Sequence, residues 1–224
     1  MDIKNPRYRS QGVHVLSAIF TVDKGVVKVL LIKRNNEPFK DYYGLVGGAL
    51  YNDETVDVAI KREVFEKTAI SEIHLEMFDV FSDVDRSPIF RMLAIGFLGI
   101  VDINSIKFIK HTEKTKDCDW FDVTQVDTLA YDHKKILNEA LKVLKERIQS
   151  TDILKYLFPT GFTIPEIQKV YEALLNTTYD RRNFRKKLLS LGIIEDTGIL
   201  KNFVGKKPAK VYKFIKNVNN RNIF

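Results

Sequence analysis

The chain has 224 residues, enough for one large domain or two smaller ones, and the absence of any run of 18 apolar residues argues against a membrane-spanning helix. A single cysteine, Cys118, excludes an internal disulfide framework, and the polar N-terminus lacks the apolar core of a signal peptide, so we expect a cytoplasmic protein. The net charge of +7 is uneven: residues 150–224 hold 14 Lys and Arg against six Asp and Glu, which favours a nucleic-acid or membrane partner for that part.

The first part of the chain reads as mixed strand and helix. Two apolar, β-branched runs, 13–20 and 26–32, are separated by a turn signal at 23–25 and predict strands of a buried sheet. Further strand patterns follow at 76–81, 92–100 and 119–123. A single apolar stripe predicts a helix over 132–149. Together these elements predict an α/β/α sandwich that ends near residue 149.

A glycine-containing run, 42–48, leads into another predicted helix, for which Asp53 or Thr55 is the expected N-cap. The apolar positions of this helix recur every four residues and face the core: Val56, Ile60 and Val64. The paired glycines before it, Gly47 and Gly48, permit a positive φ and a close approach of the backbone to a ligand. We therefore expect a ligand to lie near this junction.

Three charged residues on this helix are spaced i, i+3 and i+4, which places Glu63, Glu66 and Lys67 on one face. Carboxylates on a shared face suit Mg²⁺, a cation that requires oxygen ligands. Lysine has no acceptor atom, so we expect Lys67 to weaken Mg²⁺ binding severely. It could instead pair with Glu63 or Glu66, or attract a ligand phosphate. The same pattern alone is also compatible with a surface helix of mixed charge.

Residues 150–224 have a different character, and three short helices and a hairpin are predicted there. The helices are expected at 152–158, 163–176 and 181–191, and the strands at 193–195 and 211–214, with a cationic loop reaching 205–210 between them. The boundary residues support this reading: Thr163 and Glu166 form a capping-box pattern, Asp180 is an N-cap, and Gly192 ends the third helix. This order predicts a winged helix-turn-helix domain.

In such a domain the third helix enters the major groove and the wing lies along the phosphate backbone. The side chains expected to read or approach bases are Arg181, Arg182, Asn183, Arg185 and Lys186. The side chains expected to contact phosphates are Lys206, Lys207 and Lys210. The alternative is a solvated basic face on a small helical appendage.

The run 48–70 resembles the Nudix box, the signature of hydrolases that cut nucleoside diphosphates linked to another moiety. The run 42–48 looks like the strand and glycine turn that lead into this box. The positions in register with that motif are Gly48, Glu54, Arg62, Glu63, Val64, Glu66 and Ile70. Two positions depart, because Lys67 replaces a glutamate and Ala69 replaces a glycine. The resemblance implies a Nudix sandwich over 1–149 in which Arg62, Glu63, Glu66 and Lys67 are remnants of a catalytic box. We expect no catalytic residue, metal or resident cofactor, and Mg²⁺ on Glu63 and Glu66 only if activity persists.

A Nudix domain followed by a winged helix over 150–224 resembles the Nudix-related transcriptional regulators of bacteria. Family-like segments occur at 33–39, 85–88, 162–173, 180–187 and 207–214. The resemblance implies a homodimer that binds a duplex DNA operator, most simply as a repressor, and whose former catalytic pocket senses ADP-ribose or a sugar such as a pentose. The candidate effector contacts are Arg34, Gly47, Gly48, Lys67, Arg86 and Arg91. The effector, the operator and the choice between repression and activation stay open.

Two other classes of function compete with a regulator. An active hydrolase of ADP-ribose-like substrates would need a replacement acid, for which Glu113 or Asp117 is the candidate. An RNA-binding protein would need an aromatic stacking platform beside the basic residues, and none is evident. The scattered histidines lack metal-ligand spacing and are expected to be structural: His14, His74, His111 and His133.

Overall fold

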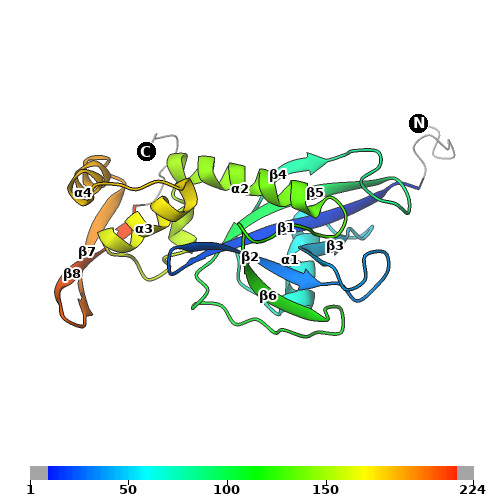
Figure 1. Ribbon diagram of the computed structural model, residues 1–224, viewed down its shortest axis with the longest axis horizontal. Coiled ribbons are helices and arrows are strands. Elements are labelled where there is room, and N and C mark those ends of the chain that lie inside the picture. Colours follow the sequence, from blue (N-terminus) through cyan, green and yellow to red (C-terminus); the bar gives the residue numbers. More distant parts are fainter. Residues whose placement is uncertain (1–9, 216–224) are drawn as a thin grey trace. The chain divides into compact units, whose positions relative to one another are not determined.

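The computed structural model describes residues 10–215, which form two compact units (Figure 1). The first unit contains residues 10–20, 28–99 and 106–141. The second contains residues 142–215 together with two short segments, 21–27 and 100–105. Within these described residues no helix combines the length and the apolar character needed to cross a membrane.

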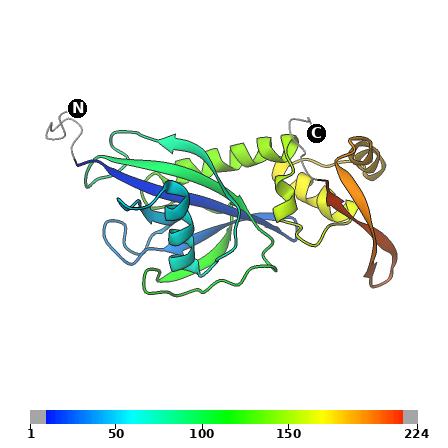
Figure 2. The same ribbon diagram turned by 180° about the vertical axis from the view of Figure 1, so that it is seen from behind.

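The first unit is built on a sheet of six strands, whose order across the sheet is β4-β5-β1-β3-β2-β6. Its strands are β1 (Gly12–Asp23), β2 (Val26–Lys33), β3 (Tyr43–Ala49), β4 (Leu75–Phe81), β5 (Met92–Ile100) and β6 (Asp117–Asp122). The helix α1 (Val56–Thr68) lies on one face, in front of the sheet in Figure 2, and the N-terminal half of α2 (His133–Ser150) covers the other face (Figures 1 and 2). The predicted α/β/α sandwich is therefore confirmed.

The central strand β1 explains why its apolar run is continuous. Residues 15–20 are all buried, including the alternate positions that would face water in a half-exposed sheet. One of them is polar, and the Ser17 hydroxyl donates to the Val46 carbonyl of β3 at 2.9 Å, which satisfies it inside the core. Helices on both faces thus require apolar residues on both faces.

The helix α1 begins and ends at identifiable caps. The Thr55 side chain accepts from the Val58 N–H, so Thr55, and not Asp53, is the N-cap. At the C-terminal end Ala69 adopts the left-handed conformation with φ 61°, and its N–H donates to the Phe65 carbonyl. Ile60 and Val64 are buried against the sheet as predicted, whereas Val56, in the first turn, is only half-buried.

The glycine run required a correction. Gly47 and Gly48 lie inside strand β3 in extended conformation, and neither has the positive φ that we expected of a turn. A Cβ at Gly47 would lie 2.0 Å from the Val15 carbonyl oxygen of β1. A Cβ at Gly48 would lie 2.4 Å from a Glu63 carboxylate oxygen. Close approach is the real reason for both glycines, and the approaching groups belong to the protein itself.

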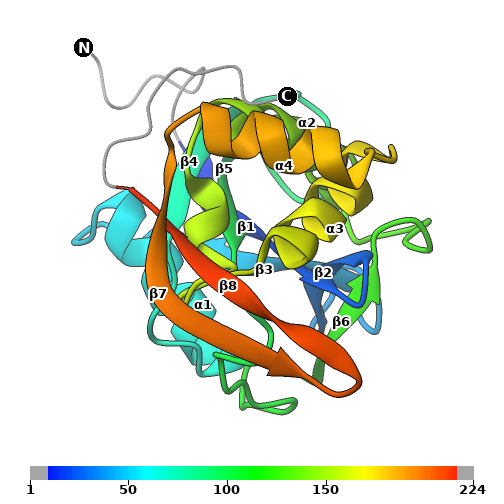
Figure 3. The same cartoon turned by 90° about the vertical axis from the view of Figure 1, so that its left-hand side faces the viewer.

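The second unit contains the predicted helices and hairpin, with two differences in extent (Figure 3). Its elements are a 3₁₀ turn η1 (Ile153–Tyr156), α3 (Ile164–Leu175), α4 (Arg181–Ser190), β7 (Ile194–Phe203) and β8 (Lys206–Phe214). The turn η1 is shorter than the helix predicted at 152–158. The hairpin strands are longer than predicted, so 206–210 lies in β8 and the connection is reduced to Val204 and Gly205.

The core of this unit is aromatic. Tyr171 of α3 is fully buried, and its ring lies 5.8 Å from that of Phe184 of α4. Its hydroxyl donates to the Ile148 carbonyl near the end of α2 at 2.9 Å. The boundary predicted at residue 149 thus falls within α2, and the C-terminal half of that helix belongs to the second unit.

Candidate functional site

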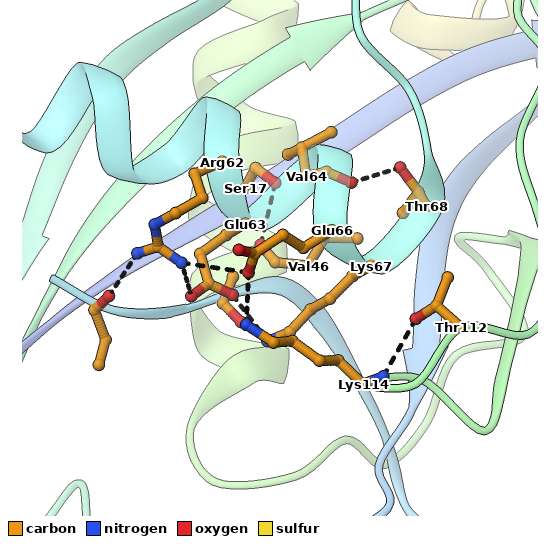
Figure 4. Close-up of polar contacts among 12 residues, drawn as sticks. Ser17, Val46, Arg62, Glu63, Val64, Glu66, Lys67, Thr68, Thr112 and Lys114 are labelled. Carbon is orange, nitrogen blue, oxygen red and sulfur yellow. Dashed lines mark hydrogen bonds and ion pairs between the residues drawn. The ribbon is translucent and has the colours of Figure 1, made fainter. Parts of the chain in front are cut away.

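The charged face of α1 carries a network of ion pairs that includes Lys67 (Figure 4). Its ammonium group forms an ion pair with Glu63 at 3.0 Å and donates a hydrogen bond to the Gly47 carbonyl of β3. The Glu63 side chain is 5% exposed and that of Lys67 is 16% exposed. Burial lowers the pKa of Lys67, and the Glu63 carboxylate opposes that shift. The predicted pairing of Lys67 with Glu63 is present.

Arg62 contacts all three carboxylates of the network. Its guanidinium contacts Glu54 at 2.6 Å, Glu63 at 2.7 Å and Glu66 at 3.3 Å. It also donates to the Ala49 carbonyl and lies over the Tyr51 ring, 4.0 Å from its centroid. The hydrogen bonds from Arg62 lower the pKa of Glu54 to about 2, so this carboxylate is charged at neutral pH.

A second lysine, Lys114, completes the network. It comes from the loop before β6, and its ammonium group contacts Glu66 at 2.5 Å. This hydrogen bond lowers the pKa of Glu66. Sequence reasoning missed Lys114 because 48 residues separate it from its partner and no local spacing links them. The network therefore balances three carboxylates, Glu54, Glu63 and Glu66, with three cations, Arg62, Lys67 and Lys114.

This arrangement does not fit a magnesium site. Mg²⁺ needs several oxygen ligands in near-octahedral geometry, whereas the carboxylates of α1 are already engaged by cations. Among the residues that the structure describes, no group of three or more His, Cys, Asp or Glu side chains could hold a metal ion. The two candidate replacement acids are Glu113 and Asp117. Glu113 is exposed, and Asp117 accepts hydrogen bonds from the Tyr43 hydroxyl and the Cys118 N–H.

The predicted effector arginines are each held by the protein. Arg86 is buried and forms a bidentate pair with Asp132, with distances of 3.0 and 2.8 Å. Arg91 donates to the Asp83 carbonyl. Arg34 donates to the Pro38 carbonyl at 2.9 Å, and its guanidinium lies over the ring of Tyr131. A ligand contact from Arg86 would need its pair with Asp132 to open, so its role as an effector contact stays a prediction.

Two histidines, the half-buried His14 and the buried His133, lie in the same cationic surroundings. His133 accepts from the Leu45 N–H through Nδ1 at 3.0 Å, which identifies the neutral tautomer. Burial, aided by the charge of Arg86, lowers the pKa of His14 to about 4 and that of His133 to about 3. In the unfolded chain both rings take up a proton near pH 6.5, and the folded protein does not. Their stabilising contribution is therefore lost as the pH falls below 6.5.

The second unit presents a basic face on α4. Asp180 caps this helix by accepting from the Asn183 N–H at 2.9 Å, and Phe184 and Leu188 point into the core. The predicted DNA-contacting residues of α4 are all exposed: Arg181, Arg182, Asn183, Arg185 and Lys186. Beside them is a hollow of about 320 Å³ whose lining includes Arg181, Arg182 and Arg185 from α4 and Gln168 from α3.

The wing lysines lie along β8 and not in a loop. Lys207 is exposed, and Lys210 pairs with Asp196 across the hairpin at 2.7 Å. The side chain of Lys206 lies outside the described part of the structure. An exposed pair such as Lys210–Asp196 contributes little to stability, so a DNA phosphate can replace the aspartate. The wing prediction is thus compatible with the strand geometry.

Both parts of the chain match known protein families. Residues 12–140 match the NUDIX domain, and residues 154–214 match the NrtR DNA-binding winged helix domain. The ADPR responsive transcriptional repressor NtrR of Acinetobacter baylyi is 31% identical over 211 residues, which cover 92% of this chain and 83% of that protein. The ADP-ribose pyrophosphatase of Methanocaldococcus jannaschii is 35% identical over 141 residues, covering 63% of this chain and 80% of that enzyme.

Among solved structures, the fold is similar to that of Shewanella oneidensis NrtR complexed with a 27mer DNA. The TM-score is 0.76 at 25% identity, covering 91% of this chain and 93% of that one. Both units are therefore found together, in the same order, in a structure that contains DNA. This chain belongs to the family of NUDIX proteins that carry an NrtR DNA-binding winged helix domain.

Proposed function

We propose that this chain is a cytoplasmic transcriptional repressor that binds operator DNA through α4 and the β7–β8 wing and releases it when its Nudix domain binds ADP-ribose. The observation that carries this proposal is the likeness to an ADP-ribose-responsive repressor over 92% of the chain. The exposed basic face of α4 supplies the chemistry that such a function needs. Arginine and asparagine side chains bind guanine and adenine edges, whereas lysines on the wing bind phosphates.

The release of DNA follows from linkage between the two binding events. We propose that two copies of the chain read two half-sites, so their spacing must match the operator. The effector can release DNA only if it binds the arrangement that does not fit the operator more tightly. A shift from mostly bound to mostly released requires a difference of roughly 5 kcal/mol in effector binding.

The network on α1 supports sensing without destruction of the effector. A hydrolase of this fold would use metal-bound water, and the carboxylates that would hold the metal are paired with Lys67, Lys114 and Arg62. An effector that is not cleaved can report its own concentration. We therefore propose that the Nudix domain acts as a receptor.

Fluorescence anisotropy tests this function directly. Labelled duplex from the region upstream of the chain's own gene is titrated with protein at about 0.15 M salt, with and without ADP-ribose. We expect binding to the duplex that ADP-ribose weakens. The Arg182→Ala variant should lose about 1–3 kcal/mol of binding if Arg182 contacts a base edge. Lys61→Ala, which removes a positive charge from an exposed position of α1 in the first unit, serves as the matched control. Equal binding to unrelated duplex, unaffected by ADP-ribose, would refute the proposal.

A second candidate function is hydrolysis of ADP-ribose. The likeness to an ADP-ribose pyrophosphatase over 63% of the chain favours it. Phosphate release coupled to a phosphatase, measured with ADP-ribose and Mg²⁺, separates the two functions. Turnover on the order of 1 s⁻¹ or faster would establish an enzyme, because most enzymes work in that range. We expect no turnover above background.

A further inference from the structure

We propose that Lys67 and Lys114 are tethered cations that replace the divalent metal of a Nudix site, so that this site recognises the diphosphate of its effector without a metal ion. The identity of the effector rests on the function proposed above. The replacement of the metal rests on the contacts of α1 alone.

Lys67 performs the structural part of this replacement. Its ammonium group lies 3.0 Å from Glu63 and also contacts the Gly47 carbonyl, so it binds two oxygen atoms from two different elements, as a metal ion would (Figure 4). Glu63 is buried, with 5% of its side chain exposed, and it needs a cation nearby because an isolated buried carboxylate is strongly unfavourable. Arg62 contacts one oxygen of Glu63, Oε1, and Lys67 supplies the cation at the other oxygen, Oε2, covalently and at every metal concentration.

Lys114 performs the part that faces the ligand. Its side chain is 47% exposed and that of its partner Glu66 is 31% exposed, so water reaches this ion pair. Exposed ion pairs are worth little, and the ammonium group can therefore leave Glu66 for a phosphate oxygen at small cost. Lysine binds phosphate as a point charge with three donors, which suits a flexible diphosphate.

The same contacts act against a metal ion. A dication placed between Glu63 and Glu66 would lie close to two ammonium groups and one guanidinium, all of which it would repel. It would also have to displace lysine from Glu63, which is the least accessible carboxylate of the three. Changing Lys67 to glutamate removes one positive charge and adds one ligand, and should restore metal binding.

Manganese binding tests the replacement in the absence of any effector. Mn²⁺, which is paramagnetic and a chemical substitute for Mg²⁺, is titrated into the full chain and the free ion is measured by electron paramagnetic resonance. We expect Lys67→Glu to bind Mn²⁺ about tenfold or more tightly than the wild type, a change of the size seen when metal sites gain or lose supporting groups. Lys61→Glu is the matched control, since it makes the same charge change at an exposed position of the same helix.

A second variant guards against misfolding of the first. Lys114→Glu places a carboxylate beside Glu66 in an exposed loop, where no buried contact is lost. We expect it to bind Mn²⁺ more tightly than Lys61→Glu. Fluorescence of Trp120, the only tryptophan, checks that each variant is folded. If Lys67→Glu and Lys114→Glu both bind Mn²⁺ no more tightly than the wild type, the proposed replacement of the metal by lysine is overturned.

Calorimetry with ADP-ribose tests the recognition of the diphosphate. Binding to the wild type should be the same in excess EDTA as in Mg²⁺, and Lys114→Met should weaken it in both conditions. Wild-type binding that requires Mg²⁺ would overturn the inference. If ADP-ribose binds the wild type in neither condition, the proposed effector is wrong, and the manganese titration still decides the role of the lysines.

Discussion

Replacing Ala69 with glycine should stabilise the first unit, although it removes a methyl group. Ala69 ends α1 in the left-handed region with φ 61° and ψ 14°. That conformation costs an L-residue roughly 1–2 kcal/mol because its Cβ approaches a carbonyl oxygen. Glycine avoids this cost but loses about 0.4–1 kcal/mol more backbone entropy on folding. The difference leaves a net gain of about 0.5–1 kcal/mol for Ala69→Gly.

Urea denaturation followed by Trp120 fluorescence measures this gain. Trp120 lies in β6 and is the only tryptophan, so its signal reports on the sheet that α1 covers. In a heating experiment the gain corresponds to a shift of about 1–4 °C for a protein of this size. The matched control is Ala59→Gly, the same change at a buried position inside α1. It should cost about 1 kcal/mol or more through helix propensity alone. An Ala69→Gly variant no more stable than the wild type would refute this reasoning.

Three further outcomes follow from contacts described above. Gly47→Ala should cost on the order of 3 kcal/mol in the same denaturation experiment, because its Cβ would meet the Val15 carbonyl, a backbone atom that cannot rotate away. Asp180→Ala should lower the stability of the second unit by about 1 kcal/mol, measured by circular dichroism, and should weaken DNA binding by fraying the first turn of α4. His133→Asn keeps an acceptor for the Leu45 N–H but cannot take up a proton. Below pH 6.5 its stability should fall less steeply than that of the wild type, by up to about 1.4 kcal/mol per pH unit. An identical pH profile for both proteins would contradict the assignment of His133 as a buried neutral ring.

The sequence predicted those parts of the fold that depend on local pattern. The apolar run at 13–20 identified β1, and the caps Thr163 and Asp180 marked the starts of α3 and α4, because a cap satisfies its own helix within three residues. The glycines of β3 were misread as a turn. Their requirement comes from Val15 and Glu63, on other elements, which no local rule can include.

The wing lysines were misplaced for a related reason. Gly205 and Pro208 lie close together and are typical of a loop, so 205–210 was predicted as one. In the structure β7 and β8 form a sheet of two strands, in which each strand is an edge. Proline is tolerated on an edge strand because its missing N–H can face solvent. Whether a strand is an edge, and so tolerates proline, depends on the number of strands in the sheet. The sequence of one strand does not reveal that number.

The candidate site divides in the same way. The pair Lys67–Glu63 follows from i, i+4 spacing and was predicted. Lys114 with Glu66 and Arg86 with Asp132 join residues 48 and 46 positions apart, and both pairs became visible only in three dimensions. The sequence suggested Arg86 as an effector contact, whereas its position shows a buried side chain already bound to a carboxylate.

The composition of the second unit has a consequence for dissecting the protein. Besides residues 142–215, this unit includes the β1–β2 turn at 21–27 and the segment 100–105, which come much earlier in the chain. A fragment cut at residue 150 would leave behind these segments and the helix end that accepts the Tyr171 hydroxyl. Residues 150–224 alone therefore do not make up the complete DNA-binding unit. It is built in part from the sensor's own chain, and transplanting it onto another sensor would require carrying those pieces along.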